Sequence, residues 1–573
     1  MTKTVADVMV EVLKDAGARR CYGVAGDTLN YVTDALRRSD LRWIHVRHEE
    51  AGAFAAGADA YLTGELALCA GSCGPGGLHF INGLWEANRN RAPVVLIASQ
   101  ILRDELGFDF PQEVDFKSVY QSGTVFCEEI RTPEQARRMT AMAAQAAIAK
   151  KGVAVLIVPV DISSAKAPDE PAFAVHRARP QTRPSDGELA RIVSAIDDGK
   201  KVAIYGGSGC ENAHAQVMAL AERLKAPVAR TSKAKDFLEH DNPFDVGMTG
   251  VFGSEGGYHA LLECDTLILL GCDFAWRQFY PDKAKIIQID IDGTHLGRRH
   301  PVDIGVVGDI APTLDALLPL LKQRDDRDFL EASLKRARHG HEKQEDRAVE
   351  GSHDIVHPQF LTEVIARHAT RDAVFTADGG SPMVWCLRHV PSTGANRTLV
   401  SLSHGTMANA MPQALGAQAA YPARQVISLS GDGGLAMLMG DMLTAVQEEL
   451  PIKIAVYNNS SLGFVEIEQK VEGLLDTYTD LKNPDFSRVA QAVGLWGRRV
   501  EHPADVDAAV REWLAVPGPA LLDVVVERNE LVFPPKIEAK QVLGMALYSA
   551  KGILAGGDRA KGVIELIGDA LRP

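Results

Sequence analysis

The chain has 573 residues, of which 46% are hydrophobic and 24% are charged, and it carries a net charge of −14 at pH 7. Because this length exceeds what a single hydrophobic core supports, we expect three or four domains in a soluble globular protein. The acidic balance argues against a general nucleic-acid binder, since no basic field is available to neutralise phosphates.

The first residues, MTKTVADVMVEVLKDAG, have the pattern of an amphipathic helix that contains acidic side chains. We interpret them as neither a signal nor a transit peptide. No apolar run approaches the roughly 18 residues of a membrane-spanning helix, so none is expected. The eight cysteines form no C-x-x-C pair, which is typical of reduced, buried thiols in a cytoplasmic protein.

Residues 1–162 alternate helical patterns with short, continuous apolar runs that carry glycine near their ends. Such runs are typical of buried parallel strands. A segment rich in proline and charge, residues 163–187, follows as a linker, and we place the first domain at 1–178. The expected strands are RRCYGVAG, LRWIHVRHEE, ELALCAGSCGPGG, APVVLIASQ and VAVLIVPVD.

Two further α/β segments are expected, at 185–335 and 355–530, followed by a tail at 531–573. The charge-dense stretch 321–354 predicts a solvated helix and a linker between them. The fold class is therefore α/β, with three doubly wound parallel-sheet domains and a short C-terminal helical tail. The expected strands are KVAIYGG, CDTLILLG and AKIIQIDID in the second segment, and AVFTADGG, QVISLSGDGG, IKIAVYNN and ALLDVVVE in the third.

The stretch SGDGGLAMLMGDMLTAVQEELPIKIAVYNN, residues 430–459, reads as a strand, a helix and a second strand. It places Asp432 and Asn459, 27 positions apart, at the carboxyl ends of parallel strands, where open α/β sheets bind ligands. A carboxylate and a carboxamide oxygen suit Mg²⁺, and the glycines beside Asp432 allow close approach of a bulky anion. The alternative is two tight turns of ordinary loop chemistry.

The spacing from GDG to NN resembles the signature of thiamine-diphosphate enzymes, and the flanking sequence is similar to the quinone-reducing bacterial pyruvate oxidases. The resemblance extends from YGVAGDTLN at 22–30 to the C-terminal tail. It implies that Asp432, the Asn459 side chain and the Ser461 carbonyl hold Mg²⁺. Gly433 and Gly434 would face the diphosphate.

The stretch SLSHGTMANAMPQALGAQAA, residues 401–420, resembles the segment of that family that binds the aminopyrimidine of thiamine diphosphate. The resemblance makes Gly405, Thr406 and Met407 cofactor-binding residues, with Met407 beneath the cofactor. A small-residue helix packed on a sheet is the alternative. The stretch RHEEAGAFAAGADAYLTG contains Glu50, which by resemblance hydrogen-bonds the aminopyrimidine and comes from a partner chain; an acidic residue that merely favours a helix N-terminus is the alternative.

Other residues match active-site positions of pyruvate oxidases. His79, Gln112, Phe464 and Glu468 are implied to be catalytic, and Asp27 and Thr28 to lie at the cofactor. An ordinary polar role for His79 and a core position for Phe464 are the alternatives. Pro111 departs from the family, which commonly has an aromatic residue directly before the glutamine.

The middle segment has no G-x-G-x-x-G, yet four of its loops resemble the FAD-binding loops of pyruvate oxidase. An α/β domain that binds no cofactor is the alternative. The residues implied to contact FAD are Gly250, Val251, Phe252, Gly253, Ser254, Phe274, Ala275, Trp276, Arg277, Gln278, Asp292, Gly293, Thr294, His295, Leu296, Gly297 and Asp309.

The tail contains an amphipathic pattern in which Val563, Ile567, Ala570 and Leu571 share a helical face. By resemblance it binds a phospholipid membrane, and the protein is then cytoplasmic and peripherally associated with the inner face of the cell membrane. The resemblance further implies oxidation of pyruvate to acetate and CO₂ with ubiquinone or a similar quinone as acceptor, and a homo-oligomer of at least a dimer, with a tetramer as the expected state. An acetolactate-synthase-type carboligase with structural FAD and a phosphate-dependent pyruvate oxidase are the enzymatic alternatives, and a cofactor-binding scaffold without turnover is the third.

Overall fold

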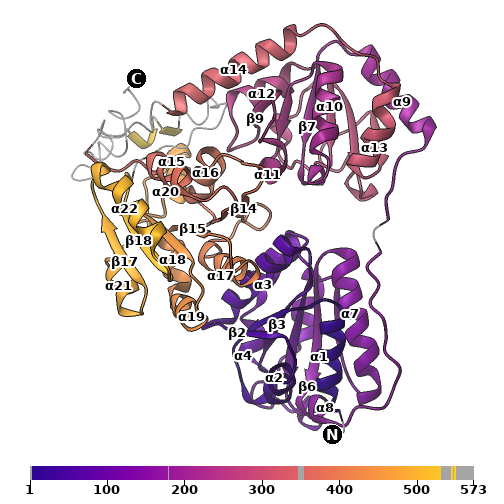
Figure 1. Cartoon of the computed structure of the whole chain (residues 1–573), viewed down its shortest axis with the longest axis vertical. Helices are drawn as coiled ribbons and strands as arrows, with labels where there is room; N and C mark the ends of the chain where they lie inside the picture. The colour runs from indigo at the N-terminus through magenta and orange to yellow at the C-terminus, as the bar shows by residue number, and fades with distance from the viewer. Residues whose placement is uncertain are drawn as a thin grey trace.

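The computed structural model describes residues 3–178, 180–345, 354–528, 530, 544–545, 547–549 and 551. It contains three six-stranded sheets in which every strand pairing is parallel. Helices cover both faces of each sheet (Figure 1). The expectation of three doubly wound α/β domains is therefore confirmed.

The first sheet has the strand order β2-β1-β3-β4-β6-β5. Its first helix begins at a capping box between Thr4 and Asp7, and its long third helix ends at Gly64 in the left-handed conformation. The elements are α1 Val5–Asp15, β1 Arg20–Gly23, α2 Asn30–Arg37, β2 Arg42–His45, α3 Glu49–Thr63, β3 Ala67–Gly71, α4 Pro75–Leu78, α5 Ile81–Arg89, β4 Val94–Gln100, α6 Phe116–Tyr120, β5 Phe126–Glu129, α7 Ala136–Lys150, β6 Val153–Pro159 and α8 Val160–Ser164.

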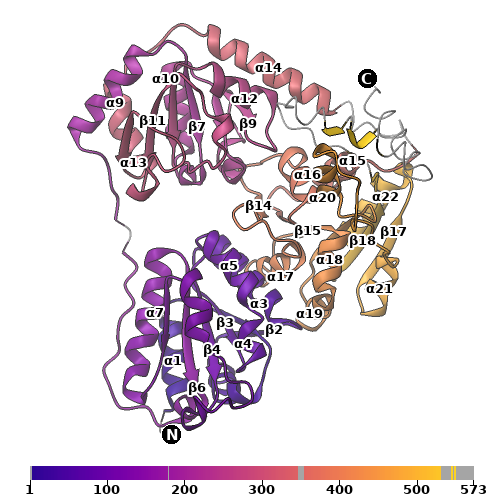
Figure 2. The same cartoon turned by 180° about the vertical axis from the view of Figure 1, so that it is seen from behind.

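The second sheet has the order β12-β11-β10-β7-β8-β9, and an extended linker joins it to the first domain along one side of the molecule (Figure 2). Helix α9 begins at a capping box between Ser185 and Glu188. The elements are α9 Asp186–Asp198, β7 Val202–Gly206, α10 His214–Leu224, β8 Val228–Arg230, α11 Lys235–Leu238, β9 Asp245–Met248, α12 Glu255–Glu263, β10 Thr266–Leu270, β11 Lys285–Asp290, β12 Ile304–Val307, α13 Ile310–Leu317 and α14 Asp328–Glu345.

The third sheet has the order β14-β13-β15-β16-β18-β17. Its core strands are buried along their whole length, as the apolar runs predict. The elements are α15 Pro358–His368, β13 Val374–Ala377, α16 Ser381–His389, β14 Arg397–Val400, α17 Ala410–Ala420, β15 Val426–Gly431, α18 Asp432–Leu438, α19 Met442–Gln447, β16 Lys453–Asn458, α20 Gly463–Val471, α21 Phe486–Ala492, β17 Trp496–Val500, α22 Pro503–Ala515 and β18 Ala520–Val525.

Helix α3 of the first domain packs against α17 of the third (Figures 1 and 2). The two backbones approach so closely that a Cβ on Gly416 would lie 2.0 Å from the carbonyl oxygen of Ala55. The small residues of both helices permit this approach, and one hydrophobic cluster spans the two domains. Within the described part of the chain, no helix is long and apolar enough to cross a membrane.

Candidate functional site

The carboxyl ends of three neighbouring strands of the third sheet carry polar side chains. Asp378 follows β13, Asp432 follows β15, and Asn459 follows β16. The chain leaves β13 for β14 on one side and later returns to β15 on the other, so Asp378 and Asp432 flank the topological switch point of the sheet. Ligands of open α/β sheets bind at this point.

Asp432 is 3% exposed and connects the strand ends through hydrogen bonds. It accepts hydrogen bonds from the backbone N–H of Gly433 (2.8 Å), from that of Ser460 (2.7 Å) and from Asn483 Nδ2 (2.7 Å). Asn459 Oδ1 accepts one from the Ser461 N–H (3.1 Å). Burial raises the pKa of Asp432, and the hydrogen bonds from Gly433, Ser460 and Asn483 oppose that shift.

A cavity of about 80 Å³ opens over these residues and is lined by the third domain. Its wall includes Asp432, Asn459 and Ser461, and a Cβ on Gly433 would lie 3.2 Å from Met407 Cε. A Cβ on Gly434 would lie 2.3 Å from Asp378 Oδ2, so this position requires glycine. Hard oxygen donors beside a cradle of glycine backbone fit Mg²⁺ and a diphosphate.

The loop before α17 holds Gly405, Thr406 and Met407. Gly405 has a φ of +76°, with open space where a Cβ would be. Asn82 on α5 donates hydrogen bonds to Thr406 Oγ1 (3.0 Å) and to Glu50 Oε1 (2.6 Å). Glu50 therefore lies beside this loop in its own chain. Its contribution from a partner chain stays a prediction.

The other first-domain residues gather at the ends of β1 and β3. Thr28 Oγ1 accepts a hydrogen bond from the Cys73 N–H (3.0 Å), and Asp27, which is exposed, accepts one from the Thr28 N–H. Gln112 has a left-handed backbone conformation with a φ of 69°. Its Oε1 lies 3.3 Å from the sulfur of Cys73. These contacts bring Asp27, Thr28 and Gln112 together.

His79 lies on the same side of the first domain. Its Nδ1 is 2.9 Å from Glu49 Oε2, and its ring stacks on that of His48 at 4.6 Å. The side chain is 46% exposed, so the His79 ring remains open to an incoming group.

Phe464 and Glu468 lie one turn apart on α20, and Phe464 borders the cavity. The ring of Phe464 meets that of Phe252 edge-on, with centroids 6.0 Å apart. Phe252 belongs to the predicted FAD loop at 250–254, so this contact joins the middle domain to the third-domain cavity. Glu468 is exposed on the same helix.

The predicted FAD loops follow strands of the middle sheet. A Cβ on Gly250, whose φ is +111°, would lie 3.2 Å from the Phe274 ring, so the loops at 250–254 and 274–278 are adjacent. Residues 275–278 are exposed, with Trp276 at 47%. Thr249 Oγ1, next to the first loop, is buried without a hydrogen-bond partner in the described structure, which fits a site that takes a polar ligand.

The predicted FAD positions at 292–297 and at Asp309 have protein partners. In the loop at 292–297, His295 is buried and its Nδ1 lies 3.2 Å from Asp290 Oδ1, while Asp292 Oδ1 accepts a hydrogen bond from the Thr294 N–H (2.9 Å). Asp309 Oδ2 accepts a hydrogen bond from the Thr182 N–H (2.7 Å), so Asp309 also anchors the interdomain linker.

The structure adds residues that the sequence reading did not select. Asp378 begins the same Asp-Gly-Gly tripeptide as Asp432, and this repetition after a strand was the available signal. Glu466 is 4% exposed and accepts hydrogen bonds from Ser461 Oγ and from Lys470 Nζ (2.6 Å). Nothing local in the sequence indicates the contacts of Asn82 and Asn483, because their partners are distant along the chain.

The amphipathic tail residues Val563, Ile567, Ala570 and Leu571 lie outside the described part of the chain. Of the tail, Tyr548 is described, and its hydroxyl donates to Asp476 Oδ1 (3.2 Å). Among the described residues no group of three or more His, Cys, Asp and Glu side chains forms a metal site. The predicted ligand set at Asp432 consists of one carboxylate, one carboxamide and one backbone carbonyl. Such a set would suit Mg²⁺, which commonly completes its coordination with phosphate oxygens and water.

Comparison with protein families gives three consecutive matches. Residues 3–119 match the N-terminal TPP-binding domain of thiamine pyrophosphate enzymes, residues 189–317 the central domain, and residues 378–524 the C-terminal TPP-binding domain. These matches follow the three sheets in order.

Known proteins with similar sequences cover nearly the whole chain. The putative thiamine pyrophosphate-containing protein YdaP of Bacillus subtilis is 34% identical over 96% of both chains. Pyruvate oxidase of Lactiplantibacillus plantarum is 30% identical over 90% of this chain and 88% of its own. The large subunit of acetolactate synthase isozyme 2 of Escherichia coli is 30% identical over 92% and 96%. The chain belongs to the thiamine pyrophosphate enzyme family.

Proposed function

We propose that the protein oxidises pyruvate to acetate and passes the electrons through FAD to a membrane quinone. The overall reaction is pyruvate + water + quinone → acetate + CO₂ + quinol. The contact between Phe252 and Phe464 carries the proposal, because it brings the predicted flavin loop to the rim of the third-domain cavity. A structural flavin needs no such contact with the reacting site.

When bound, thiamine diphosphate supplies the nucleophilic carbon and the electron sink for decarboxylation, and FAD accepts the electron pair. In this proposal Asp432, Asn459 and the Ser461 carbonyl hold Mg²⁺. The backbone of Gly433 and Gly434 approaches the diphosphate, since neither residue has a side chain to block it.

Gly405, Thr406 and Met407 form the proposed cradle of the aminopyrimidine. Met407 supports the ring from below, and Glu50 holds a proton at the ring nitrogen. The hydrogen bond from Asn82 supports this assignment, because it fixes the orientation of the Glu50 carboxyl within the first domain. Glu50 supplied by a second copy of the chain would require at least a dimer, and a tetramer is the state we propose.

The substrate side of the proposed site belongs to His79, Gln112 and Glu468. The imidazole of His79 is oriented by Glu49 and open to solvent, so it can donate a proton to the substrate carboxylate or carbonyl. Polar groups together with the apolar Phe464 suit a small 2-oxo acid with one charged end and one methyl end.

The quinone acceptor and the membrane are the most specific part of the proposal. The amphipathic pattern at 563–571 supports docking of the tail on a phospholipid surface, which would bring the flavin domain to a lipid-soluble quinone. Co-sedimentation of the full chain with phosphatidylglycerol vesicles tests this part. Binding should increase when pyruvate reduces the flavin, and equal binding with and without pyruvate contradicts a reduction-dependent tail.

Product analysis tests the reaction. Pyruvate, Mg²⁺, thiamine diphosphate and a short-chain ubiquinone should give acetate and quinol in equal amounts, with no requirement for phosphate or O₂. Acetolactate formed without quinol would instead indicate the carboligase, and acetyl phosphate with peroxide the phosphate-dependent oxidase.

A further inference from the structure

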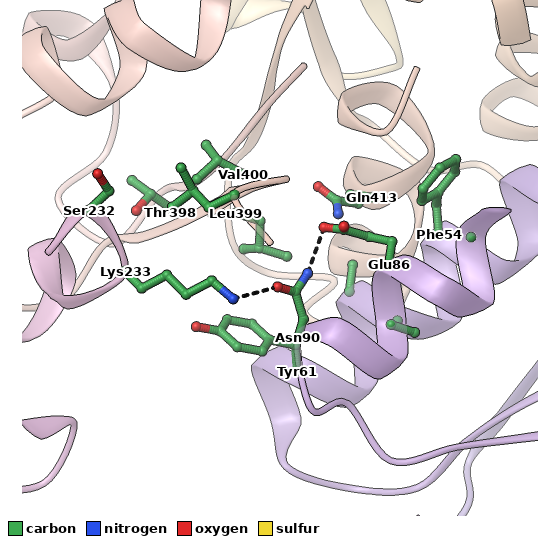
Figure 3. Close-up of a pocket in the computed structure, with 15 residues that line it drawn as sticks. Phe54, Tyr61, Glu86, Asn90, Ser232, Lys233, Thr398, Leu399, Val400 and Gln413 are labelled. Carbon is green, nitrogen blue, oxygen red and sulfur yellow. Dashed lines mark hydrogen bonds between the residues drawn. The ribbon is translucent and has the colours of Figure 1, made fainter. Parts of the chain in front are cut away.

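A small polar cavity lies where all three domains meet (Figure 3). Its wall contains Glu86 and Asn90 from the first domain, Lys233 from the middle domain, and Thr398 and Gln413 from the third. The cavity volume is about 30 Å³, which is enough for one or two water molecules and too small for a substrate. We therefore consider what its side chains do for the surrounding protein.

A continuous chain of hydrogen bonds runs through the junction. Lys233 Nζ donates to Asn90 Oδ1 (2.9 Å), and Asn90 Nδ2 donates to Glu86 Oε1 (2.6 Å), as Figure 3 shows. The Ser401 hydroxyl donates to Glu86 Oε2 (2.8 Å). Ser401 Oγ then accepts the backbone N–H groups of Gly405 and Thr406, both at 3.0 Å.

The direction of these bonds is fixed by the number of donors and acceptors. A serine hydroxyl has one hydrogen and two lone pairs. The N–H groups of Gly405 and Thr406 occupy both lone pairs of Ser401, so its hydrogen needs an acceptor. Glu86, 2% exposed, is that acceptor. Asn90 also donates to Glu86, so an ionised carboxylate at position 86 accepts hydrogen bonds from both Asn90 and Ser401. A carboxamide at this position would turn its NH₂ group toward one of these two donors.

Titratable side chains from two other domains face Glu86. Burial raises the pKa of Glu86; the hydrogen bonds from Ser401 and Asn90 oppose that shift most, and Lys233 and His404 oppose it further. His404 Nε2 lies 2.8 Å from Oδ1 of Asn82, and Asn82 precedes Glu86 by one turn of α5. Burial also lowers the pKa of Lys233 to about 8; Glu86 opposes this shift, and the nearby Arg91 adds to it.

We propose that Glu86 is a positioning residue for thiamine diphosphate. It orients the Ser401 hydroxyl, which holds the backbone of Gly405 and Thr406 and so presets the loop that receives the aminopyrimidine. Lys233, from the middle domain, adds to the hydrogen bonds from Ser401 and Asn90 in favouring the ionised form of Glu86. The inference rests on the proposed role of Gly405, Thr406 and Met407 and extends it to residues that do not touch the cofactor.

The test is the equilibrium affinity of the apoprotein for thiamine diphosphate at saturating Mg²⁺, measured by calorimetry. Glu86→Gln and Ser401→Ala should each raise the Kd about tenfold or more, because each leaves the loop without its anchor. Turnover at saturating cofactor should fall much less than the affinity. Asp59→Asn is the matched control: Asp59 is 2% exposed and pairs with Arg20 and Tyr22 inside the first domain, so its loss should reduce stability and leave the Kd unchanged.

The Lys233→Met variant separates positioning from simple folding support. Without the ammonium group, Glu86 takes up its proton at higher pH, so the loss of cofactor affinity on acidification should begin at higher pH than in the wild type. If Glu86→Gln fails to fold, the pH dependence of cofactor affinity can still be compared between the wild type and Lys233→Met. Superimposable profiles, or a Kd within twofold of the wild type in Glu86→Gln, would overturn the proposal. A wild type that binds thiamine diphosphate but leaves its flavin oxidised would overturn only the proposed reaction.

Discussion

The ring of Phe252 in the middle domain meets the ring of Phe464 in the third domain edge-on, with centroids 6.0 Å apart and planes at 62°. Arg388 strengthens this contact by donating from Nε to the Phe252 carbonyl oxygen (3.2 Å). The pair connects a loop predicted to hold FAD with a cavity predicted to hold thiamine diphosphate. An account in which electrons move between the two cofactors depends on this connection.

Replacing Phe464 by alanine should slow flavin reduction more than decarboxylation. The substitution removes the aromatic ring between the two predicted cofactor sites and leaves Asp432 and Glu50 intact. Stopped-flow absorbance gives the rate of flavin reduction, and CO₂ release with ferricyanide gives decarboxylation; we expect a loss of about tenfold or more in the first. Phe126, on strand β5 of the first domain, provides the control as Phe126→Leu. An equal loss in both rates would mean that Phe464 acts on the substrate and not on electron transfer.

Glu50→Gln should abolish turnover while FAD stays bound. The amide cannot hold a proton at the aminopyrimidine in the way that the carboxyl does, and a fall in kcat of about a hundredfold or more is expected for loss of an acid–base group. Steady-state kinetics measure the loss of turnover, and the flavin content of the purified variant shows whether FAD stays bound. Glu128→Gln, which removes an exposed partner of Lys117, is the control. Undiminished turnover in Glu50→Gln would remove Glu50 from the mechanism.

Mg²⁺ affinity should fall as the pH decreases. In the proposed site the metal binds the ionised carboxylate of Asp432. Burial raises the pKa of that group, so protons should compete at a higher pH than they would at an exposed aspartate. Titration of Mg²⁺ into the thiamine diphosphate complex between pH 5 and 8 measures this effect. In Asp432→Asn we expect the Mg²⁺ affinity to drop about tenfold or more and to lose its pH dependence. A pH-independent Mg²⁺ affinity in the wild type would place the metal elsewhere.

Asp378 should make the apoprotein less stable as the pH rises. Burial raises the pKa of Asp378 to about 7, against an ordinary value of 3.8, and hydrogen bonds from the Ala410 and Gly431 N–H groups oppose the shift. The folded state therefore holds a proton that the unfolded state releases, and this contribution to stability is present below about pH 4 and lost as the pH rises to about 7. The Tm of the wild type minus that of Asp378→Asn should therefore fall over that interval, because the asparagine does not titrate. A constant difference would show that Asp378 is already ionised at pH 4.

The strands that the sequence predicts are the buried, continuous ones. The apolar runs at Val94–Gln100 and Val153–Pro159 are central strands, as predicted. Among the edge strands, the sequence predicts Arg42–His45 but misses Phe126–Glu129 and Trp496–Val500. Edge strands are only half covered, so their side chains lack the continuous apolar pattern on which the prediction depends.

The same contrast holds for the site. Asp432 and Asn459 could be predicted because strand ends and glycine turns are local features of the sequence. The chain of contacts from Lys233 to Ser401 could not, since its members come from three domains and meet only after folding. Glu86 and Asn90 look like ordinary polar positions of an amphipathic helix, and only their burial against other domains distinguishes them.

Anaerobic addition of pyruvate to the protein with Mg²⁺ and thiamine diphosphate tests the central claim most directly. The absorbance is followed at about 450 nm, where oxidised flavins absorb. We expect bleaching that depends on both pyruvate and thiamine diphosphate and that a quinone reverses. Bound flavin that stays oxidised while pyruvate is consumed would contradict the account and favour the carboligase.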